Sequence, residues 1–563
     1  MKDPKKDELC RERYNALLPN LADYVEKYAR ERPHDIAIAE YNTGATVTWK
    51  RFNMTVNAFA AKLLSMGIGK GDIVATSLPM LKEHVYLMYA CFRAGIIVAP
   101  LDLRLKAKEI KYCVEKIQPK AYFFVGVPQI SKVIQEVMPA APSVSTWVQF
   151  QKDESNILPG AISSTQFSKD IKKQYILSTI FGSVRKARRT TGKRNASVII
   201  FTTGSTGSPK PALLCHENIL VQSMAIAVAF EFNETDNILV NLPPSHVGCM
   251  TEQLTTAICG GGTAVLLHVF DPKKSLDAIQ KHKVTMLGQI PALYKMEWRL
   301  PGFKDYDLSS LKFAIYGAQS MDLPSLEKMK AMAPRIATGL GLTETAGFCT
   351  YTDVNASAEE ISKGIGYDQP ICPISIREPM KPDGSAGDKK ADGEIGEICF
   401  TGPQIFIGYM NDPVNTAKTI SREGVLYTGD VGYYDSNGLH FAGKGKNVIK
   451  PKGFQVFPQD VEKHFSEKLK GKVGTIACVG AEHNVYSEAI ILFVECLNGQ
   501  TLTADEVMAA SRDIASYSRP SHVEILKQGE IPIDRAAKTD YLLMKEKAKQ
   551  IVEGLRAEGK WDR

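Results

Sequence analysis

The sequence predicts an α/β fold in two parts. We expect a large N-terminal domain of two pseudo-symmetric α/β units with a small β-barrel-like subdomain, followed by a small, mobile α/β C-terminal domain. Apolar strand patterns alternate with helical patterns through the first part, which is typical of parallel sheets covered by helices. The order strand, Leu-Pro, helix, glycine, strand occurs twice, starting at Asp72 and at Asp236. From Gly393 onward, short strands separated by Gly and Asp indicate β-hairpins instead.

The first unit follows from apolar residues at helical or strand spacing, with Pro79 and Gly95 as breaks. Strands are expected over 47–49, 73–78, 96–99 and 121–125, and helices around 21–29, 52–63, 84–94 and 107–117. The following residues, 126–195, interleave Pro, Ser and charges. We expect loops and short elements there, without a function.

The second unit repeats the alternation of strands and helices, and the residues from Gly393 onward should form shorter strands. Strands are expected over 197–201, 236–242, 264–267, 285–287 and 313–316, then over 397–400, 424–428, 432–434 and 439–442. The C-terminal part should contain strands over 475–479, 489–494 and 523–526 and a helix over 541–555. Gly443 and Gly445 flank Lys444, so the backbone can swivel at Gly445-Lys446. We therefore expect one domain over residues 1–445 and a mobile domain over 446–563.

Composition limits the class of protein. A chain of 563 residues is too long for a single hydrophobic core. A hydrophobic content of 44% and a charged content of 23% are typical of globular proteins. The net charge of +7 is modest for this length and does not indicate a nucleic-acid partner. The densest basic run, Arg185 to Arg194, predicts a solvated loop, with a phosphate or membrane contact as the alternative.

The cysteines and the N-terminus bear on location. Eleven cysteines are scattered singly, without Cys-x-x-Cys spacing, which suggests reduced thiols. Met1 to Arg13 is charged and lacks the apolar core of a signal peptide. No run of about eighteen apolar residues predicts a membrane span. We expect a cytoplasmic monomer or homodimer.

The most informative stretch runs from Ser197 to Asn218. An apolar strand leads into nine residues, Thr202 to Lys210, with two Gly, five hydroxyl side chains, one Pro and one Lys. Glycine allows close backbone approach, while hydroxyls, N–H groups and a lysine donate to phosphate oxygens. A solvated linker is the alternative, and neither the Walker A nor the dinucleotide pattern fits. The expected phosphate ligands are Thr202, Thr203, Gly204, Ser205, Thr206, Gly207 and Lys210.

Further motifs place polar groups after predicted strands. Thr343-Glu344 offers a phosphate donor and a hard oxygen ligand for Mg²⁺, although such a pair often only caps a helix. Asp430, at the end of Tyr427-Thr-Gly-Asp, has two acceptor oxygens that suit the two ribose hydroxyls. Other segments are Tyr316-Gly-Ala-Gln-Ser320, Pro243-Pro-Ser-His246-Val-Gly248, Gly443-Lys-Gly-Lys446 and Ile531-Pro-Ile-Asp-Arg-Ala-Ala-Lys538.

Taken in order, these segments resemble the AMP-forming adenylating enzymes (acyl-CoA synthetases, luciferases and peptide-synthetase adenylation domains), closest to the acid–CoA ligases. The resemblance implies ATP, Mg²⁺ and coenzyme A as cofactors, with Glu344 as the magnesium ligand and Lys538, Thr343 and His246 as catalytic residues. It implies nucleotide contacts at Gly317, Ala318, Gln319, Gly341, Leu342, Asp430 and Lys444. It places the domain hinge at Lys446 and a thiol channel at Lys450, Lys452 and Gly453.

The resemblance also outlines the acid pocket. Its walls would be His246, Gly248, Tyr316, Gly317, Leu340, Gly341 and Phe348. Its three glycines leave room, so a medium-chain, cyclic or aromatic acid is expected rather than acetate. The Phe-Asp pair that holds an amino group in peptide-synthetase domains is missing, which disfavours amino acids, although Glu252 follows one helical turn later.

Four residues depart from the family pattern: Pro211, Leu340, Lys444 and Ala537. Pro211 should stiffen the C-terminal side of the phosphate loop. These departures keep two alternatives open. One is an acyl-AMP ligase that loads a carrier-protein phosphopantetheine, and the other is a non-catalytic homologue that only binds nucleotide.

Overall fold

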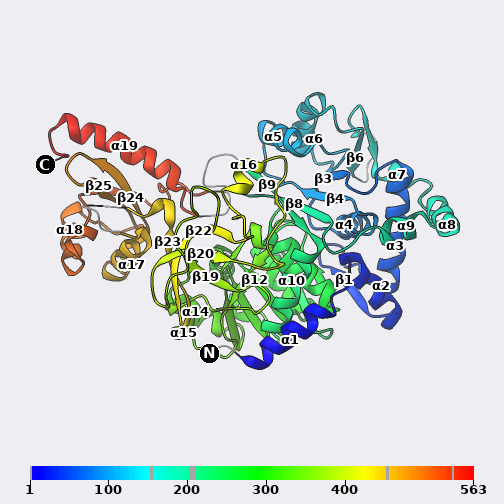
Figure 1. Cartoon of the computed structure of the whole chain (residues 1–563), viewed down its shortest axis with the longest axis horizontal. Helices are drawn as coiled ribbons and strands as arrows, with labels where there is room; N and C mark the ends of the chain where they lie inside the picture. The colour runs from blue at the N-terminus through cyan, green and yellow to red at the C-terminus, as the bar shows by residue number, and fades with distance from the viewer. Residues whose placement is uncertain are drawn as a thin grey trace.

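The computed structural model describes residues 3–151, 156–202, 209–449, 451, 456–534 and 538–562. Figure 1 shows a large body that contains the N-terminus and a smaller lobe, at the left of the view, that contains the C-terminus. Sheets and helices alternate in both parts. The expected α/β class, with a large N-terminal and a smaller C-terminal domain, is therefore confirmed.

An eight-stranded sheet in the order β21-β9-β8-β4-β3-β5-β6-β7 forms one layer of the large domain. Its strands are β3 (Ile73–Ser77), β4 (Ile97–Pro100), β5 (Ala121–Val125), β6 (Thr146–Phe150), β7 (Ala161–Ser163), β8 (Ala196–Thr202), β9 (Lys210–Cys215) and β21 (Gly408–Tyr409). The pairs from β8 to β7 are parallel, whereas the β8–β9 and β9–β21 pairs are antiparallel. Most of these strands are buried on both faces, as their apolar runs predict.

A seven-stranded sheet in the order β14-β13-β12-β10-β11-β1-β2 forms the second layer. Its strands are β1 (Ile36–Glu40), β2 (Thr46–Thr48), β10 (Asn237–Val240), β11 (Thr263–Leu266), β12 (Met286–Gln289), β13 (Phe313–Tyr316) and β14 (Arg335–Thr338). β10 lies between β11 and β12, just as β3 lies between β4 and β5. The repeated sequence order therefore corresponds to a repeated strand arrangement.

Two long helices fill the space between the sheets. α4 (Lys82–Ala94) and α10 (His216–Ala229) are buried along nearly their whole length, and one hydrophobic core joins them to strands of both sheets. Helices that are apolar all round are suited to such a central layer. The other helices of the first half are α1 (Pro4–Asn15), α2 (Leu21–Glu31), α3 (Trp49–Ser65), α5 (Ala107–Ile117), α6 (Pro128–Val137), α7 (Ser164–Ser168), α8 (Ile171–Phe181) and α9 (Ser183–Arg189).

A π-helix follows β10 and leads into the remaining helices of this domain. It is labelled η3 and spans Gly248–Thr255. After it come α11 (Thr256–Gly260), α12 (Pro272–His282), α13 (Pro291–Trp298), α14 (Leu323–Lys330), α15 (Ala358–Lys363) and α16 (Pro413–Ala417). None of the helices in the described residues is both long and apolar enough to cross a membrane.

The expected barrel-like subdomain is a four-stranded antiparallel sheet. It contains β19 (Ile374–Arg377), β20 (Gly396–Phe400), β22 (Leu426–Asp435) and β23 (Gly438–Lys444) in that order. Within the described residues the sheet is open, because β19 and β23 do not pair with each other. The two strands expected over 424–428 and 432–434 are one strand, β22, whose pairing shifts register at Gly432.

The short turn η6 (Gly445–Asn447) leads from β23 toward the smaller lobe. Three strands, β24 (Val473–His483), β25 (Ser487–Cys496) and β26 (His522–Leu526), form its sheet. α17 (Pro458–Lys468) and α18 (Ala504–Ala510) pack on one face, and α19 (Tyr541–Ala557) packs on the other. Alternate residues of β25 therefore point into two separate cores.

One expectation is wrong. Residues 126–195 do not consist of loops and short elements alone, because β6 and β7 extend the large sheet, α6 packs on β5, and α8 and α9 pack on α3. The sequence pattern is obscured there because these elements lie at the sheet edge and stay partly exposed. Polar positions on edge elements weaken the periodic signal on which the prediction depends.

Candidate functional site

The hairpin of β8 and β9 flanks the predicted phosphate loop. Thr202 pairs with Lys210 at its open end, so both residues flank the loop. Residues Thr203 to Gly207 lie outside the described residues. Pro211 pairs with Phe201, and its carbonyl accepts a hydrogen bond from the N–H of Met410 at 2.8 Å. This bond ties the C-terminal side of the loop to the segment that leads out of β21.

Lys210 and Glu344 both contact the same tyrosine, Tyr409. Lys210 Nζ lies 5.2 Å from the ring centre of Tyr409, and Tyr409 Oη donates a 2.5 Å hydrogen bond to Glu344 Oε1. Burial and the adjacent Glu344 carboxylate both raise the pKa of Tyr409. No motif in the sequence pointed to Tyr409, because it reaches this position only through the pairing of β21 with β9.

A tight turn carries Thr343 and Glu344. β15 (Gly341–Leu342) and β16 (Gly347–Phe348) form a small ribbon around the turn η5 (Thr343–Thr345). Ala346 has a φ of +55°, and a Cβ atom at Gly341 would lie 2.8 Å from the backbone of the facing strand. The backbone can therefore approach this closely only with glycine at position 341.

The segment after β13 lies against the same ribbon. A Cβ atom on Gly317 would come within 2.9 Å of the Phe348 ring, so glycine is needed for this contact. Ala318 has a φ of +72°, a conformation that side chains rarely adopt. Strained backbone of this kind clusters at ligand-binding sites. Gln319 follows on the same turn, and Tyr316 is buried at the strand end.

Asp430 and Lys444 form an ion pair across β22 and β23. Asp430 is only 2% exposed, and this burial raises the pKa of its carboxyl group, while Lys444 acts in the opposite direction. Lys444 thus places a positive charge directly opposite the carboxylate.

Lys538, which belongs to the C-terminal domain, lies close to the Asp430–Lys444 pair. Burial lowers the pKa of Lys538, and repulsion from Lys444 lowers it further, whereas Asp534 and Asp430 raise it. The backbone N–H of Lys538 donates to Asp534 Oδ1 at 2.9 Å. A residue near the end of the chain therefore lies among charged groups of the N-terminal domain.

His246 lies within the electrostatic reach of Lys538. Protein atoms around the imidazole desolvate it and lower its pKa to about 4, although the residue stays accessible to solvent. The positive charge of Lys538 lowers this pKa further. The N–H of Gly248 donates to Nδ1 at 3.1 Å, which assigns the proton of the neutral ring to Nε2. Nε2 is therefore a hydrogen-bond donor at neutral pH. Asp102 and Arg104, which the sequence analysis missed, also influence this pKa.

Two polar side chains lie beside the predicted acid pocket. Glu252, on the π-helix, accepts a 2.9 Å hydrogen bond from the N–H of Phe348, and burial raises its pKa to about 7. Gln222 on α10 is fully buried, and neither end of its amide has a hydrogen-bond partner among the described residues. A Cβ atom at Gly347 would contact both side chains, so they lie on the same side of the ribbon. Gln222 gave no signal in the sequence, because it is one of several polar residues in a helix that is buried along nearly its whole length.

Several predicted site residues lie outside the described part. They are Lys450, Lys452 and Gly453 of the thiol channel, and Ala537 beside Lys538. The side chain of Lys446 is not described either, although its backbone belongs to the turn η6.

The described donors fit a nucleoside triphosphate. Lys210 and the hairpin suit phosphate oxygens, and Asp430 has the carboxylate oxygens that suit vicinal hydroxyls. Glu344 supplies a carboxylate beside Lys210, and Mg²⁺ usually takes one or two carboxylates together with substrate phosphates. Glu344 is therefore the residue that would hold the ion.

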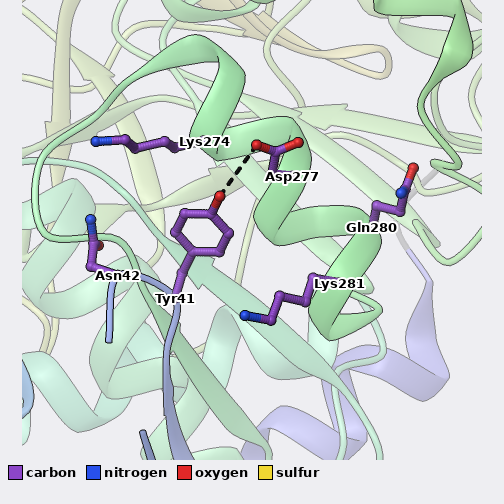
Figure 2. Close-up of a pocket in the computed structure, with 6 residues that line it drawn as sticks. All are labelled: Tyr41, Asn42, Lys274, Asp277, Gln280 and Lys281. Atoms are coloured by element: carbon purple, nitrogen blue, oxygen red, sulfur yellow. Dashed lines mark hydrogen bonds between the residues drawn. The ribbon is translucent and has the colours of Figure 1, made fainter. Parts of the chain in front are cut away.

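The surface carries a separate hollow of about 490 Å³ on α12, away from these groups. Figure 2 shows its lining, with Lys274, Asp277 and Lys281 on one helix and Tyr41 bonded to Asp277. It contains none of the predicted site residues.

Comparison with known proteins identifies the family. Residues 25–410 match the model of the AMP-binding enzyme family. A long-chain-fatty-acid–CoA ligase of Bacillus subtilis is 28% identical over 91% of this chain and 92% of its own length. A feruloyl-CoA synthase of an Amycolatopsis species is 26% identical over 90% of this chain and 94% of its own. The solved structure of the anthranilate CoA ligase AuaEII with anthranoyl-AMP superposes with a TM-score of 0.80 at 17% identity, covering 96% of this chain and 99% of its own. The chain thus belongs to the AMP-binding enzyme family, as its motifs predict.

Proposed function

We propose that this enzyme is an AMP-forming acid–CoA ligase. In the first step a carboxylate attacks the α-phosphate of ATP, giving an acyl-adenylate and pyrophosphate. In the second step the thiol of coenzyme A attacks the acyl carbon and AMP leaves. The curated relatives, which include a fatty-acid–CoA ligase and a feruloyl-CoA synthase, support this reaction class.

The position of Lys538 is the observation that carries the proposal. This lysine comes from the C-terminal domain, yet its charge interacts with Asp430 and Lys444 and reaches His246. It therefore lies close to the groups assigned to the nucleotide and to the residue assigned to the acid. A cation at that point can bring two anionic reactants together and stabilise the charge that builds up on the phosphate.

The chain acts by positioning the substrates and by neutralising their charge, without a covalent bond between the enzyme and the acyl group. Lys210 and the donors of the β8–β9 hairpin hold the phosphates that leave as pyrophosphate. Asp430 accepts from the ribose, and Thr343 donates to the phosphate. Neutral His246 donates from Nε2 to the carboxylate oxygen of the acid. When bound, Mg²⁺ at Glu344 offsets the charge of the triphosphate.

The second step requires a different arrangement of the C-terminal domain. Lys538 occupies the reaction centre in the arrangement that suits adenylation. We propose that the domain then pivots at Lys446 and brings the segment around Lys450, Lys452 and Gly453 to the acyl-adenylate. The domain boundary at 445–446 is part of this proposal.

The acid is proposed to be a medium-chain, cyclic or aromatic one. Gly248 and Gly317 leave no side chain in the pocket, and Leu340 and Phe348 provide apolar walls. The buried amide of Gln222 and the carboxyl of Glu252 add polar groups beside this wall. A polar substituent on the acid would pair with them, because buried polar groups are costly without partners.

A pyrophosphate-release screen with ATP, Mg²⁺ and a panel of acids tests the function. The panel should span acetate, C6–C12 fatty acids and ring acids. Turnover with medium-chain or ring acids, followed by acyl-CoA when coenzyme A is added, is the expected result. Acyl-AMP that persists with coenzyme A but disappears with a phosphopantetheinylated carrier protein would indicate the carrier-loading alternative. No pyrophosphate with any acid would indicate the non-catalytic alternative.

A further inference from the structure

The basic run at Arg185 to Arg194 forms part of a protruding tip that the catalytic site does not use. Residues 169–194 hold nine Lys or Arg and one Asp, a net charge of +8, whereas the whole chain carries +7. The positive charge of the protein is therefore concentrated in this segment. Figure 1 shows α8 and α9 at the edge of the molecule, at the end opposite the C-terminal lobe.

The tip also exposes large apolar side chains. Phe181 is 79% exposed, Ile180 is 67% exposed and Ile176 is 57% exposed. Phe181 is the most exposed large apolar side chain among the described residues. The three lie at the C-terminal half and end of α8, so they form one patch instead of being scattered.

The helix that carries this patch is packed against the rest of the domain. α8 packs against α3, and Ile171 at its start contacts the main core. The hydroxyl of Ser178 accepts hydrogen bonds from Ser183 and from the N–H of Val184, which fixes the turn between α8 and α9. The apolar side chains are thus presented outward by ordered helices whose other faces are already packed.

The cations around the patch are available for a partner. Arg188 pairs with Asp23, and Arg194 pairs with Glu217. Across the described ranges no carboxylate pairs with Lys172, Lys173, Arg185, Lys186 or Arg189, and all five side chains are exposed. An open hollow of about 310 Å³ is lined by Ile180, Phe181, Gly182, Arg185, Lys186, Arg189 and Thr190. Apolar and cationic groups therefore face the same hollow.

We propose that the tip formed by α8 and α9 docks on the surface of a bilayer that contains anionic lipids. Phe181, Ile180 and Ile176 enter the boundary between head groups and acyl chains. Arg185, Lys186 and Arg189 contact the phosphates of the head groups. An apolar patch rimmed by cations is the pattern that interfacial binding requires, since either part alone binds only weakly. Docking would leave the C-terminal domain, at the opposite end of the molecule, free in solvent.

Vesicle binding of the full chain tests this surface without using its activity. Co-sedimentation should be measured with phosphatidylcholine vesicles containing 30% phosphatidylglycerol and with pure phosphatidylcholine vesicles. We expect at least about tenfold stronger partitioning onto the anionic vesicles, and a comparable loss when NaCl is raised from 0.1 to 0.5 M. Equal binding to both vesicle types, or no binding to either, overturns the proposal.

Two variants separate the apolar and the cationic contributions. Ile180→Asp/Phe181→Asp and Arg185→Glu/Lys186→Glu/Arg189→Glu should each reduce partitioning about tenfold or more. The matched controls are Val485→Asp, at another exposed apolar residue, and Lys274→Glu/Lys281→Glu, in the hollow of Figure 2. Both controls should bind vesicles like the unmodified protein. Circular dichroism melts confirm that each variant is folded.

Two other outcomes would overturn the proposal in favour of a different partner. Salt-sensitive binding to DNA or RNA that Ile180→Asp/Phe181→Asp leaves unchanged, without vesicle binding, would show that the basic run serves nucleic acid. Self-association in analytical ultracentrifugation that the same variant abolishes, without vesicle binding, would show that the patch is an interface between copies of the chain.

Discussion

Lys538 connects the two domains at the scale of a single residue. It lies among Asp430, Lys444 and His246, where its positive charge faces the proposed reaction centre. Lys538→Ala should slow adenylation on the order of 10²–10³-fold, because an oriented charge at the developing transition state is lost. Thioester formation from added acyl-AMP should be spared. Both half-reactions can be followed by quenched-flow assays, with the exposed Lys549→Ala as the control.

If Lys538→Ala releases pyrophosphate at the normal rate, the role given to this lysine is wrong. A loss of both half-reactions together would instead indicate damage to the C-terminal domain.

The lowered pKa of Lys538 has a consequence for pH dependence. Burial and Lys444 make this lysine lose its proton at lower pH than an ordinary lysine with a pKa of 10.5. Raising the pH therefore removes the useful charge early, and kcat/KM for ATP should fall on the alkaline side below that value. Lys538→Arg should move this fall to higher pH, since arginine stays protonated. An unchanged alkaline limb in Lys538→Arg would show that another group causes it.

Gln222 should influence the choice of acid. In the part of the chain that the structure describes, its amide has no hydrogen-bond partner, so an acid with a hydroxyl or amino substituent can satisfy it. Gln222→Met should lower kcat/KM for such an acid relative to its unsubstituted analogue by about tenfold, the effect of one buried hydrogen bond. The control is Gln149→Met, another buried glutamine, whose amide is bonded within β6 and its neighbours. An unchanged ratio between the two acids would exclude contact between Gln222 and the substrate.

At the scale of elements, the C-terminal sheet is joined to its helices by a buried carboxyl group. Glu462 on α17 accepts hydrogen bonds from Tyr541 Oη at 2.6 Å and from the N–H of Cys478 at 2.8 Å, both through Oε1. Burial raises the pKa of Glu462 from 4.5 to about 7. The folded protein then binds more protons than the unfolded chain between these values. Stability should therefore fall as pH rises from about 4.5 to 7 and stay reduced above it.

Glu462→Gln keeps the oxygen that accepts both bonds but cannot ionise. At pH 8 it should raise the free energy of unfolding of the C-terminal domain by on the order of 1–3 kcal/mol. At pH 4.5 it should have little effect. Urea unfolding followed by circular dichroism at both values measures the difference, and equal effects at both pH values would contradict the charged, buried state.

At the scale of the whole molecule, the proposed cycle needs the C-terminal domain in two positions. Lys446→Pro restricts the backbone of the proposed pivot and of the residue before it. Pyrophosphate release should stay within about threefold, because Lys538 already lies at the site, whereas thioester formation should slow about 100-fold. Lys446→Ala, which leaves the backbone free, is the control. Equal slowing of both half-reactions would place the pivot elsewhere.

Much of the molecule could be predicted from the sequence because its signals are local. The strand patterns around β3 and β10, the glycines at 317 and 341, and each of the motifs lie within short segments. The same local signals predicted the two-domain α/β fold and the enzyme family. They failed over 126–195, where edge strands and half-exposed helices lack a clear period.

Other features were decided only by tertiary structure, because they depend on residues far apart in the chain. Tyr409 joins Lys210 and Glu344 only after β21 pairs with β9. Gln222 has no hydrogen-bond partner within the described ranges because its helix, α10, is buried between two sheets. Burial lowers the pKa values of Lys538 and His246, and charges from the other domain, Lys444 for Lys538 and Lys538 for His246, lower them further. Sequence alone determined which groups are present, and long-range packing determined their neighbours and hence their charge states.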